Sequence, residues 1–211
     1  MAANFGRFKG DVIALWLPDG RNMKLTQRFA YIDPRGKEWV APMGSVVNGA
    51  SIPGSLWSVV GGPFEGQYRH ASVIHDVGCE EMTSKWEDVH LMFYEACRCG
   101  GVSEARGKMM YYAVYNFGPR WQPRTPGAGP LSAVRSFGAG AAGPGAMLFA
   151  TQPVAVDPQD LRAIMEFIHE ENPSLAQLRQ LTPQVAQASS LARAARPSVA
   201  KRKKAKRKPR G

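Results

Sequence analysis

The amino-acid sequence predicts an α+β protein in which an N-terminal antiparallel β meander is followed by a bundle of about three helices. Residues 11–47 are rich in branched and aromatic residues, interrupted by turns that contain Pro and Gly. After Pro53 the apolar residues recur with helical spacing. The last third predicts a C-terminal helical extension and a basic tail that we expect to be disordered by charge repulsion.

The predicted strands come first along the chain. VIALWL (12–17) and MKLTQRFAYI (23–32) are separated by Pro18-Asp19-Gly20, which is a strong turn signal. A second turn, Asp33-Pro34-Arg35-Gly36, leads to the short strand EWVAP (38–42). Strands joined by turns this short pair in antiparallel fashion, so the pattern predicts a meander.

Three helices are predicted next, at residues 67–78, 83–99 and 103–117. Thr83 or Ser84 is expected to cap the second helix, with Glu87 in the position of a capping box. Gly100 and the glycine after it are expected to end that helix, and Ser103 to open the next one.

Composition divides the chain further. We expect an α+β domain at 1–122, a linker rich in Pro, Gly and Ala at 123–156, a helical extension at 157–195 and the disordered tail at 196–211. Leu161, Ile164, Met165 and Ile168 form an apolar stripe on the helix predicted at 157–171. That stripe packs either on the body of the protein or on another chain.

The positive charge is concentrated at the C-terminal end. Ten of the 27 Lys and Arg residues lie from Arg193 onward, which leaves 17 basic residues against 17 acidic ones in the rest of the chain. We expect the tail to bind nucleic acid or another polyanion without sequence preference; the alternative is a solubilising or incidental tail. The expected polyanion-binding residues are Lys201, Arg202, Lys203, Lys204, Lys206, Arg207, Lys208 and Arg210.

Cysteine content and apolar runs indicate a cytoplasmic setting. The three cysteines, Cys79, Cys97 and Cys99, are too few for a disulfide scaffold. The first residues hold no apolar stretch of signal-peptide length, and no run is long enough to span a bilayer.

One helix face carries reactive side chains. If residues 68–79 form a helix, His75, Asp76 and Cys79 lie opposite the apolar stripe, with His75 and Cys79 one turn apart. His90 lies at the margin of the apolar face of the next helix. Should the two helices pack as a hairpin, His90 approaches His75 and Asp76.

These residue types suit a metal centre. Two imidazoles and a carboxylate from His75, His90 and Asp76 can bind a divalent ion such as Zn, Mn or Ca, which lowers the pKa of a bound water. Without a metal, a histidine can act as a general base, or Cys79 as a nucleophile beside His75. The alternative is a purely structural polar network. His70, on the apolar stripe, is expected to be a packed core residue.

Several segments together resemble domain-of-unknown-function family 1353 over about residues 5–122. They are VVNGASIPGSLWSVVGGPFEGQYRHASVIHDVGC, WEDVHLMFYEACRCGGV and MMYYAVYNFGPRW. The resemblance implies a phage, prophage or bacterial origin. It carries over to Ser51, Pro53, Trp57, Tyr68, His75, Asp76, Cys79 and His90. The chain departs from the family at Asn48, where members often have Asp, which weakens any metal binding at that position.

Two functions follow as expectations. The first is a small metal-assisted hydrolase that uses His75, Asp76 and His90, with substrate contacts from Asn48, Ser51, Trp57 and Tyr68. The second is a non-enzymatic phage or accessory protein whose His/Asp cluster is structural. The run ASVIHDVG also resembles the His-Asp signature of HD-type phosphohydrolases, but that fold is all-helical and the β-rich start argues against it.

Overall fold

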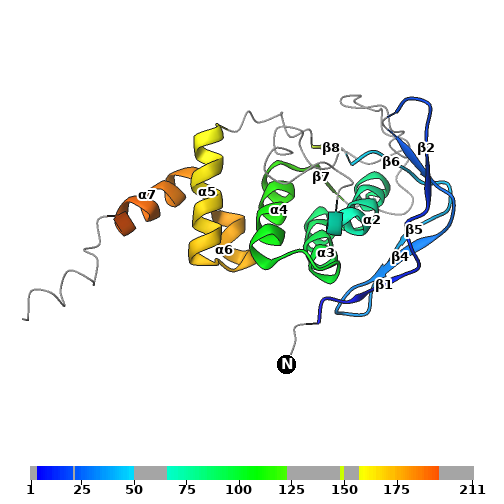
Figure 1. Cartoon of the computed structure of the whole chain (residues 1–211), viewed down its shortest axis with the longest axis horizontal. Helices are drawn as coiled ribbons and strands as arrows, with labels where there is room; N and C mark the ends of the chain where they lie inside the picture. Colours follow the sequence, from blue (N-terminus) through cyan, green and yellow to red (C-terminus); the bar gives the residue numbers. More distant parts are fainter. Residues whose placement is uncertain (1–3, 21, 50–65, 123–147, 150–156, 195–211) are drawn as a thin grey trace, which may run out of the picture. The chain divides into compact units, whose positions relative to one another are not determined.

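Antiparallel strands precede a set of packed helices, which confirms the predicted α+β class (Figure 1). The computed structural model describes residues 4–20, 22–49, 66–122, 148–149 and 157–194. The chain divides into two units, Met1–Ala155 and Val156–Gly211. None of the helices in these described ranges combines the length and hydropathy that a bilayer crossing requires.

The N-terminal strands form two small sheets rather than one meander. The strands are β1 (Arg7–Lys9), β2 (Ala14–Trp16), β3 (Met23–Leu25), β4 (Phe29–Ile32), β5 (Glu38–Ala41) and β6 (Val46–Val47). They pair in the orders β1-β4-β5 and β2-β3-β6, and every pair is antiparallel. The single strand predicted at 23–32 is therefore wrong. The backbone N–H and the hydroxyl of Thr26 both donate to the Ile13 carbonyl at the end of the β2–β3 pairing, and the chain then enters the other sheet.

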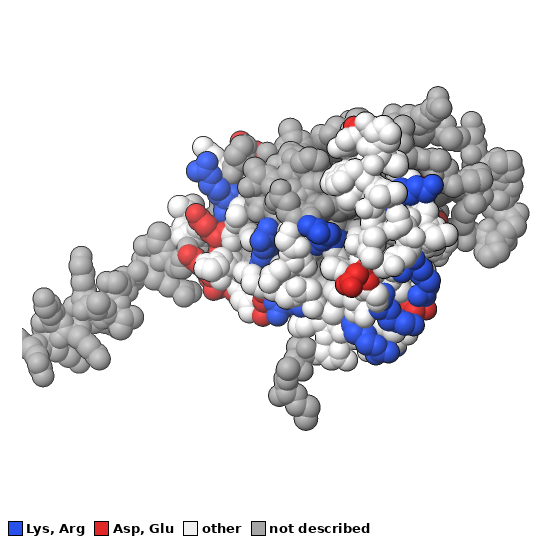
Figure 2. Space-filling view, turned by 45° about the vertical axis from the view of Figure 1, so that its right-hand side comes forward, with Lys and Arg blue, Asp and Glu red and all other residues white. Residues whose placement is uncertain are grey.

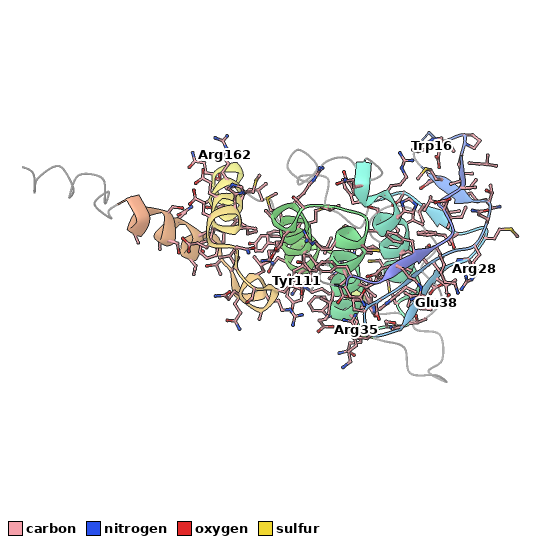
Figure 3. All side chains as sticks on the ribbon, turned by 60° about the horizontal axis from the view of Figure 1, so that its bottom comes forward. Trp16, Arg28, Arg35, Glu38, Tyr111 and Arg162 are labelled. Carbon is pink, nitrogen blue, oxygen red and sulfur yellow. The ribbon has the colours of Figure 1, made fainter. Side chains whose placement is uncertain are left out.

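The turn between β4 and β5 ties its sheet to a helix. The Asp33 carboxylate accepts backbone N–H groups from Arg35 and Lys37 and the indole N–H of Trp39. The Arg35 guanidinium also donates to both carboxylate oxygens of Glu95, at 2.7 and 2.8 Å. Figure 3 shows Arg35 at the edge of the molecule, close to the strands. This network holds the sheet against the helices that carry the site.

Three helices follow a short 3-10 turn, η2 (Gly66–Tyr68): α2 (Arg69–Glu81), α3 (Trp86–Cys99) and α4 (Glu104–Phe117). In Figure 1 they lie side by side, and α2 contacts β5 and β6 while α3 contacts β1. The α2–α3 crossing is close, because a Cβ on Gly78 would lie 3.0 Å from Cγ1 of Val89. Phe29, Tyr31, Ile74, Phe93 and Met92 are among the buried core residues.

The ends of α3 differ in part from the prediction. Its N-cap is Lys85, which makes no side-chain cap, so the cap expected from Thr83 or Ser84 is wrong. Ser84 is engaged in tertiary contacts instead: its hydroxyl accepts from Lys37 Nζ and its carbonyl from the indole of Trp121. The C-cap is Gly100, as predicted.

The second unit confirms the predicted helical extension. It contains α5 (Pro158–Glu171), α6 (Leu175–Gln180) and α7 (Pro183–Ala194). Asp157 caps α5, and Ser174 with Gln177 forms a capping box on α6. Helices α5 and α7 pack against each other. In the first unit, β7 (Arg120–Trp121) pairs with β8 (Leu148–Phe149).

Charged side chains of both signs lie on the face that Figure 2 shows. Figure 2 shows basic side chains spread over one face, with acidic side chains among them. Ion pairs such as Lys9 and Arg28 with Glu38 account for part of this mixture. The tail predicted to be disordered lies outside the described residues.

Candidate metal centre

Helices α2 and α3 bring two histidines and a cysteine together. His75 Nε2 lies 2.9 Å from His90 Nδ1, and Cys79 Sγ lies 3.7 Å from His75 Nε2. One ligand atom from each of the three residues lies within 4.8 Å of the other two. All three side chains are buried, and His90 is 0% exposed. The predicted approach of His90 to His75 is therefore present in the structure.

Local packing explains this convergence. His75 and Cys79 are one helical turn apart, so their side chains lie on the same face of α2. The small Gly78 permits the close approach of α3. The His75 ring packs 4.5 Å from the ring of Phe93, and His90 makes edge contacts with Trp86 and Trp121. These aromatic contacts restrict the rotamers of both histidines.

A backbone carbonyl sets the tautomer of His90. Its Nε2 lies 3.1 Å from the Pro119 carbonyl oxygen, which only accepts hydrogen bonds. Nε2 therefore carries the proton and donates, which leaves a lone pair on Nδ1 facing His75. A histidine that donates its second N–H to a backbone carbonyl is the usual arrangement around a metal ligand.

Burial keeps both imidazoles neutral at neutral pH. It lowers the pKa of His75 well below its usual value, and the neighbouring His90 adds to that shift. Burial also lowers the pKa of His90 to about 3; the hydrogen bond to the Pro119 carbonyl opposes this shift, and the positive charge of Arg120 adds a smaller decrease. Neutral imidazole is the form that binds metal ions.

Asp76 holds a loop rather than joining the three convergent ligands. Its Oδ2 accepts the backbone N–H groups of Asn48 at 3.2 Å and Gly49 at 2.5 Å. In the described part of the chain, the group able to hold an ion consists of His75, Cys79 and His90. The sequence predicts Cys79 only as a nucleophile, although its one-turn spacing from His75 also fits a ligand role.

The other predicted site residues lie in different surroundings. Asn48 contributes its backbone N–H to Asp76. Tyr68 is buried before α2, with the Arg106 guanidinium over its ring at 5.3 Å. His70 packs against the rings of Phe8 and Phe29, with a third of its side chain exposed. Ser51, Trp57 and the tail residues Lys201, Arg202, Lys203, Lys204, Lys206, Arg207, Lys208 and Arg210 lie outside the described residues.

The donor set and its spacing fit a small ion of the zinc type. Around tetrahedral zinc, neighbouring nitrogen ligands are about 3.4 Å apart and a nitrogen and a sulfur about 3.6 Å apart. The distance of 3.7 Å between nitrogen and sulfur is close to the second of these values, while the two nitrogens, at 2.9 Å, would have to move apart by about 0.5 Å to bind the same ion. Two imidazoles and a thiolate favour zinc over the oxygen-seeking ions Mn and Ca.

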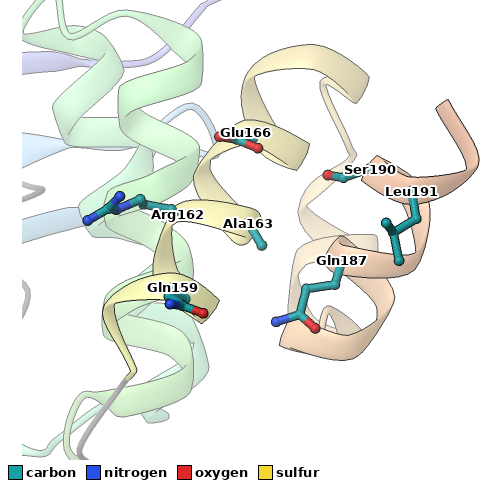
Figure 4. A pocket seen from close by; sticks show the side chains of 7 residues that line it. All are labelled: Gln159, Arg162, Ala163, Glu166, Gln187, Ser190 and Leu191. Carbon is teal, nitrogen blue, oxygen red and sulfur yellow. The ribbon is translucent and has the colours of Figure 1, made fainter. Parts of the chain in front are cut away.

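The second unit has a hollow of its own. It measures about 500 Å³ and lies between α5 and α7, with Arg162, Glu166 and Gln187 among its lining residues (Figure 4). The Gln187 amide donates to Asp160 across these helices. These three lining side chains are exposed, so they lack the burial that commonly makes side chains reactive at functional sites.

Comparison with known proteins supports the family resemblance. Residues 23–114 match the family described as "Protein of unknown function (DUF1353)", which confirms the resemblance predicted from the motifs. This range includes all three convergent ligands but not Pro119. No solved structure matches the chain.

Two curated relatives come from Sinorhizobium fredii (strain NBRC 101917 / NGR234). "Uncharacterized protein y4jT" is 46% identical over 102 residues, which cover 48% of this chain and 30% of the relative. "Uncharacterized protein y4iH" is 36% identical over 121 residues, which cover 57% of this chain and 51% of the relative. The chain thus spans about half or less of the length of these relatives.

Proposed function

We propose that the domain containing residues 23–114 is a metal-assisted hydrolase that holds a zinc-type ion on His75, Cys79 and His90. The convergence of these three buried ligand atoms from two helices is the observation that carries the proposal. The tautomer set by Pro119 supports it, because it leaves the facing nitrogen of His90 available as a ligand.

Three protein ligands suit hydrolysis because they leave one position of a tetrahedral ion for water. Such an ion, when bound, lowers the pKa of that water enough to supply hydroxide near neutral pH. Asp76 connects α2 to the loop that starts at Asn48, where the predicted substrate contacts begin. The phage or bacterial origin that the resemblance implies makes cell-wall and nucleotide compounds the first natural substrates to test, by analogy.

Hydrolysis of 4-nitrophenyl acetate by metal-stripped and zinc-reloaded protein tests this proposal. We expect turnover that requires zinc and is lost in His90→Ala, since that variant removes one ligand. Cys97→Ala is the matched control, because Cys97 is equally buried on α3 and lies outside the ligand group. Equal turnover with and without zinc, or in His90→Ala, would contradict the proposal.

A second candidate is the non-enzymatic accessory protein with a structural polar cluster. The direct 2.9 Å contact between the His75 and His90 nitrogens favours it, since two neutral imidazoles can share one hydrogen bond. In that case His75→Ala lowers the melting temperature by the same amount in the presence and absence of zinc. Under the hydrolase proposal, zinc stabilises the wild type and not the variant.

A further inference from the structure

One face of α2 carries four polar side chains in successive turns. Ser72, His75, Asp76 and Cys79 have the spacing i, i+3, i+4, i+7, which places them on one side of a helix. All four are buried. His75 contacts His90 and Cys79, and Asp76 accepts the amides of the Asn48 loop.

Ser72 differs from the other three. It is 2% exposed, and its Oγ has no hydrogen-bond partner among the described residues. A helical serine ordinarily satisfies its hydroxyl by donating to the carbonyl one turn earlier, and leaving a buried hydroxyl unpaired costs free energy. The orphan hydroxyl therefore points to a polar partner outside the described residues.

The position of Ser72 identifies where that partner binds. Residues three and four apart on a helix have Cβ atoms about 5–6 Å apart. One small bound group can therefore contact Ser72 together with His75 or Asp76. We propose that Ser72 donates a hydrogen bond to the carbonyl oxygen of an amide or ester substrate beside the His75–Cys79–His90 centre. This inference rests on the proposed function and names its substrate class.

Local charge favours a neutral carbonyl over an anion. Asp76 is the charged residue on this face of α2, so a carboxylate or phosphate bound here would meet a like charge. The nearby Arg120 is only partly engaged elsewhere: its Nη2 donates to the carbonyls of Tyr115 and Asn116, and the guanidinium lies 4.8 Å from the Trp86 ring, while its buried Nε has no partner among the described residues.

The reaction that follows is ordinary acyl transfer to water. The water oxygen bonds to the carbonyl carbon, and the bond from that carbon to the leaving nitrogen or oxygen breaks. One water proton passes to the leaving amine or alkoxide, and the other stays with the acid product. The Ser72 hydroxyl stabilises the negative charge that develops on the carbonyl oxygen.

Acetohydroxamate, a metal-binding amide analogue, tests the inference on cobalt-substituted protein. Its dissociation constant is measured from the cobalt absorption spectrum for wild type, Ser72→Ala, Ser72→Thr and Ser103→Ala. We expect about tenfold weaker binding in Ser72→Ala, the effect of one hydrogen bond. Ser72→Thr, which keeps a hydroxyl, should retain most of the affinity. Ser103→Ala, at an exposed cap position without a side-chain cap bond, should match wild type.

The outcomes separate the two proposals. One outcome is that the wild type and Ser72→Ala both show a cobalt–thiolate absorption band and bind hydroxamate with equal affinity. This result would overturn the role of Ser72 but not the metal centre. Stronger binding of inorganic phosphate than of hydroxamate would overturn the substrate class. No cobalt–thiolate band in the wild type would overturn the metal centre and this inference with it.

Discussion

Asp76 connects two segments that are 27 residues apart, because its carboxylate receives two consecutive backbone N–H groups at the end of β6. Asp76→Ala would leave these groups unpaired, at a cost of about 2–4 kcal/mol in unfolding free energy. Asp76→Asn keeps an accepting oxygen and should cost less. Urea denaturation measures both variants.

The same variants show whether the Asp76 carboxylate only holds the loop at Asn48 or also binds the metal ion. Because Asp76 is occupied by the loop amides, we expect Asp76→Asn to keep the zinc content of the wild type. If Asp76→Asn lost zinc as fully as His75→Ala, the carboxylate would be a ligand and the assignment of Cys79 in its place would be contradicted.

Contacts between site residues were predicted best where both residues lie on the same helix, because their spacing in the sequence then decides whether they are neighbours. His75 and Cys79 are neighbours on any helix, and their shared face was visible in the sequence. The contact of His90 required the hairpin packing of two helices, which the sequence predicted only conditionally. The Pro119 carbonyl lies 29 residues from His90, and no local pattern indicates such a contact.

At the scale of elements, the α2–α3 crossing positions the ligands. Gly78→Ala places a methyl group 3.0 Å from Cγ1 of Val89, and overpacking of this kind costs about 1–3 kcal/mol. The helix-forming advantage of Ala over Gly, about 1 kcal/mol, offsets part of that cost. We expect lower stability in urea. Zinc binding should also weaken, because the added methyl group pushes α2 away from α3, and His75 and His90 lie on these two helices.

A double-mutant cycle isolates this steric effect. In a Val89→Ala background the contact is absent, so Gly78→Ala should be neutral or stabilising there. The same destabilisation in both backgrounds would show that the crossing is not close at this point.

The β4–β5 turn makes a second element-scale prediction, one of pH dependence. Burial alone would raise the pKa of Asp33, but hydrogen bonds from Trp39, Lys37 and Arg35 together hold it below its usual value. The ionised carboxylate therefore stabilises the fold at pH values above the unfolded pKa of about 4, and this contribution is lost as pH falls through the lower folded pKa.

Asp33→Asn tests that dependence. We expect the variant to be about 2 kcal/mol less stable than wild type at pH 7, and the difference to shrink as the pH is lowered below 4. Urea unfolding at a series of pH values measures it. A difference that is constant with pH would contradict the role assigned to the charge.

Helices and strands were predictable where the apolar residues keep one regular spacing over several turns, and less so where the chain passes from one sheet to the other. The helices were expected within about three residues of their observed ends, because their apolar spacing extends over several turns. The strand expected at 23–32 is two strands, since Thr26 binds Ile13 and the chain then leaves that sheet. The preference of residues for β structure does not predict which other strand a strand will pair with.

For the whole molecule, the charge distribution predicts a separable polyanion-binding segment. Eight of the ten residues at 201–210 are Lys or Arg, while the rest of the chain is nearly balanced. Deletion of residues 197–211 should weaken binding to duplex DNA and flatten its dependence on salt, because fewer counterions are released. The measurement is a DNA titration at two salt concentrations, and unchanged affinity would exclude the tail as the binding element.

The most direct test of the central claim is the zinc content of the purified full-length chain, determined by elemental analysis after dialysis. The account predicts one zinc ion per chain for the wild type and for Cys97→Ala, and almost none for His75→Ala, Cys79→Ala and His90→Ala. A wild type without zinc, or a Cys79→Ala variant with the same zinc content as the wild type, would contradict it.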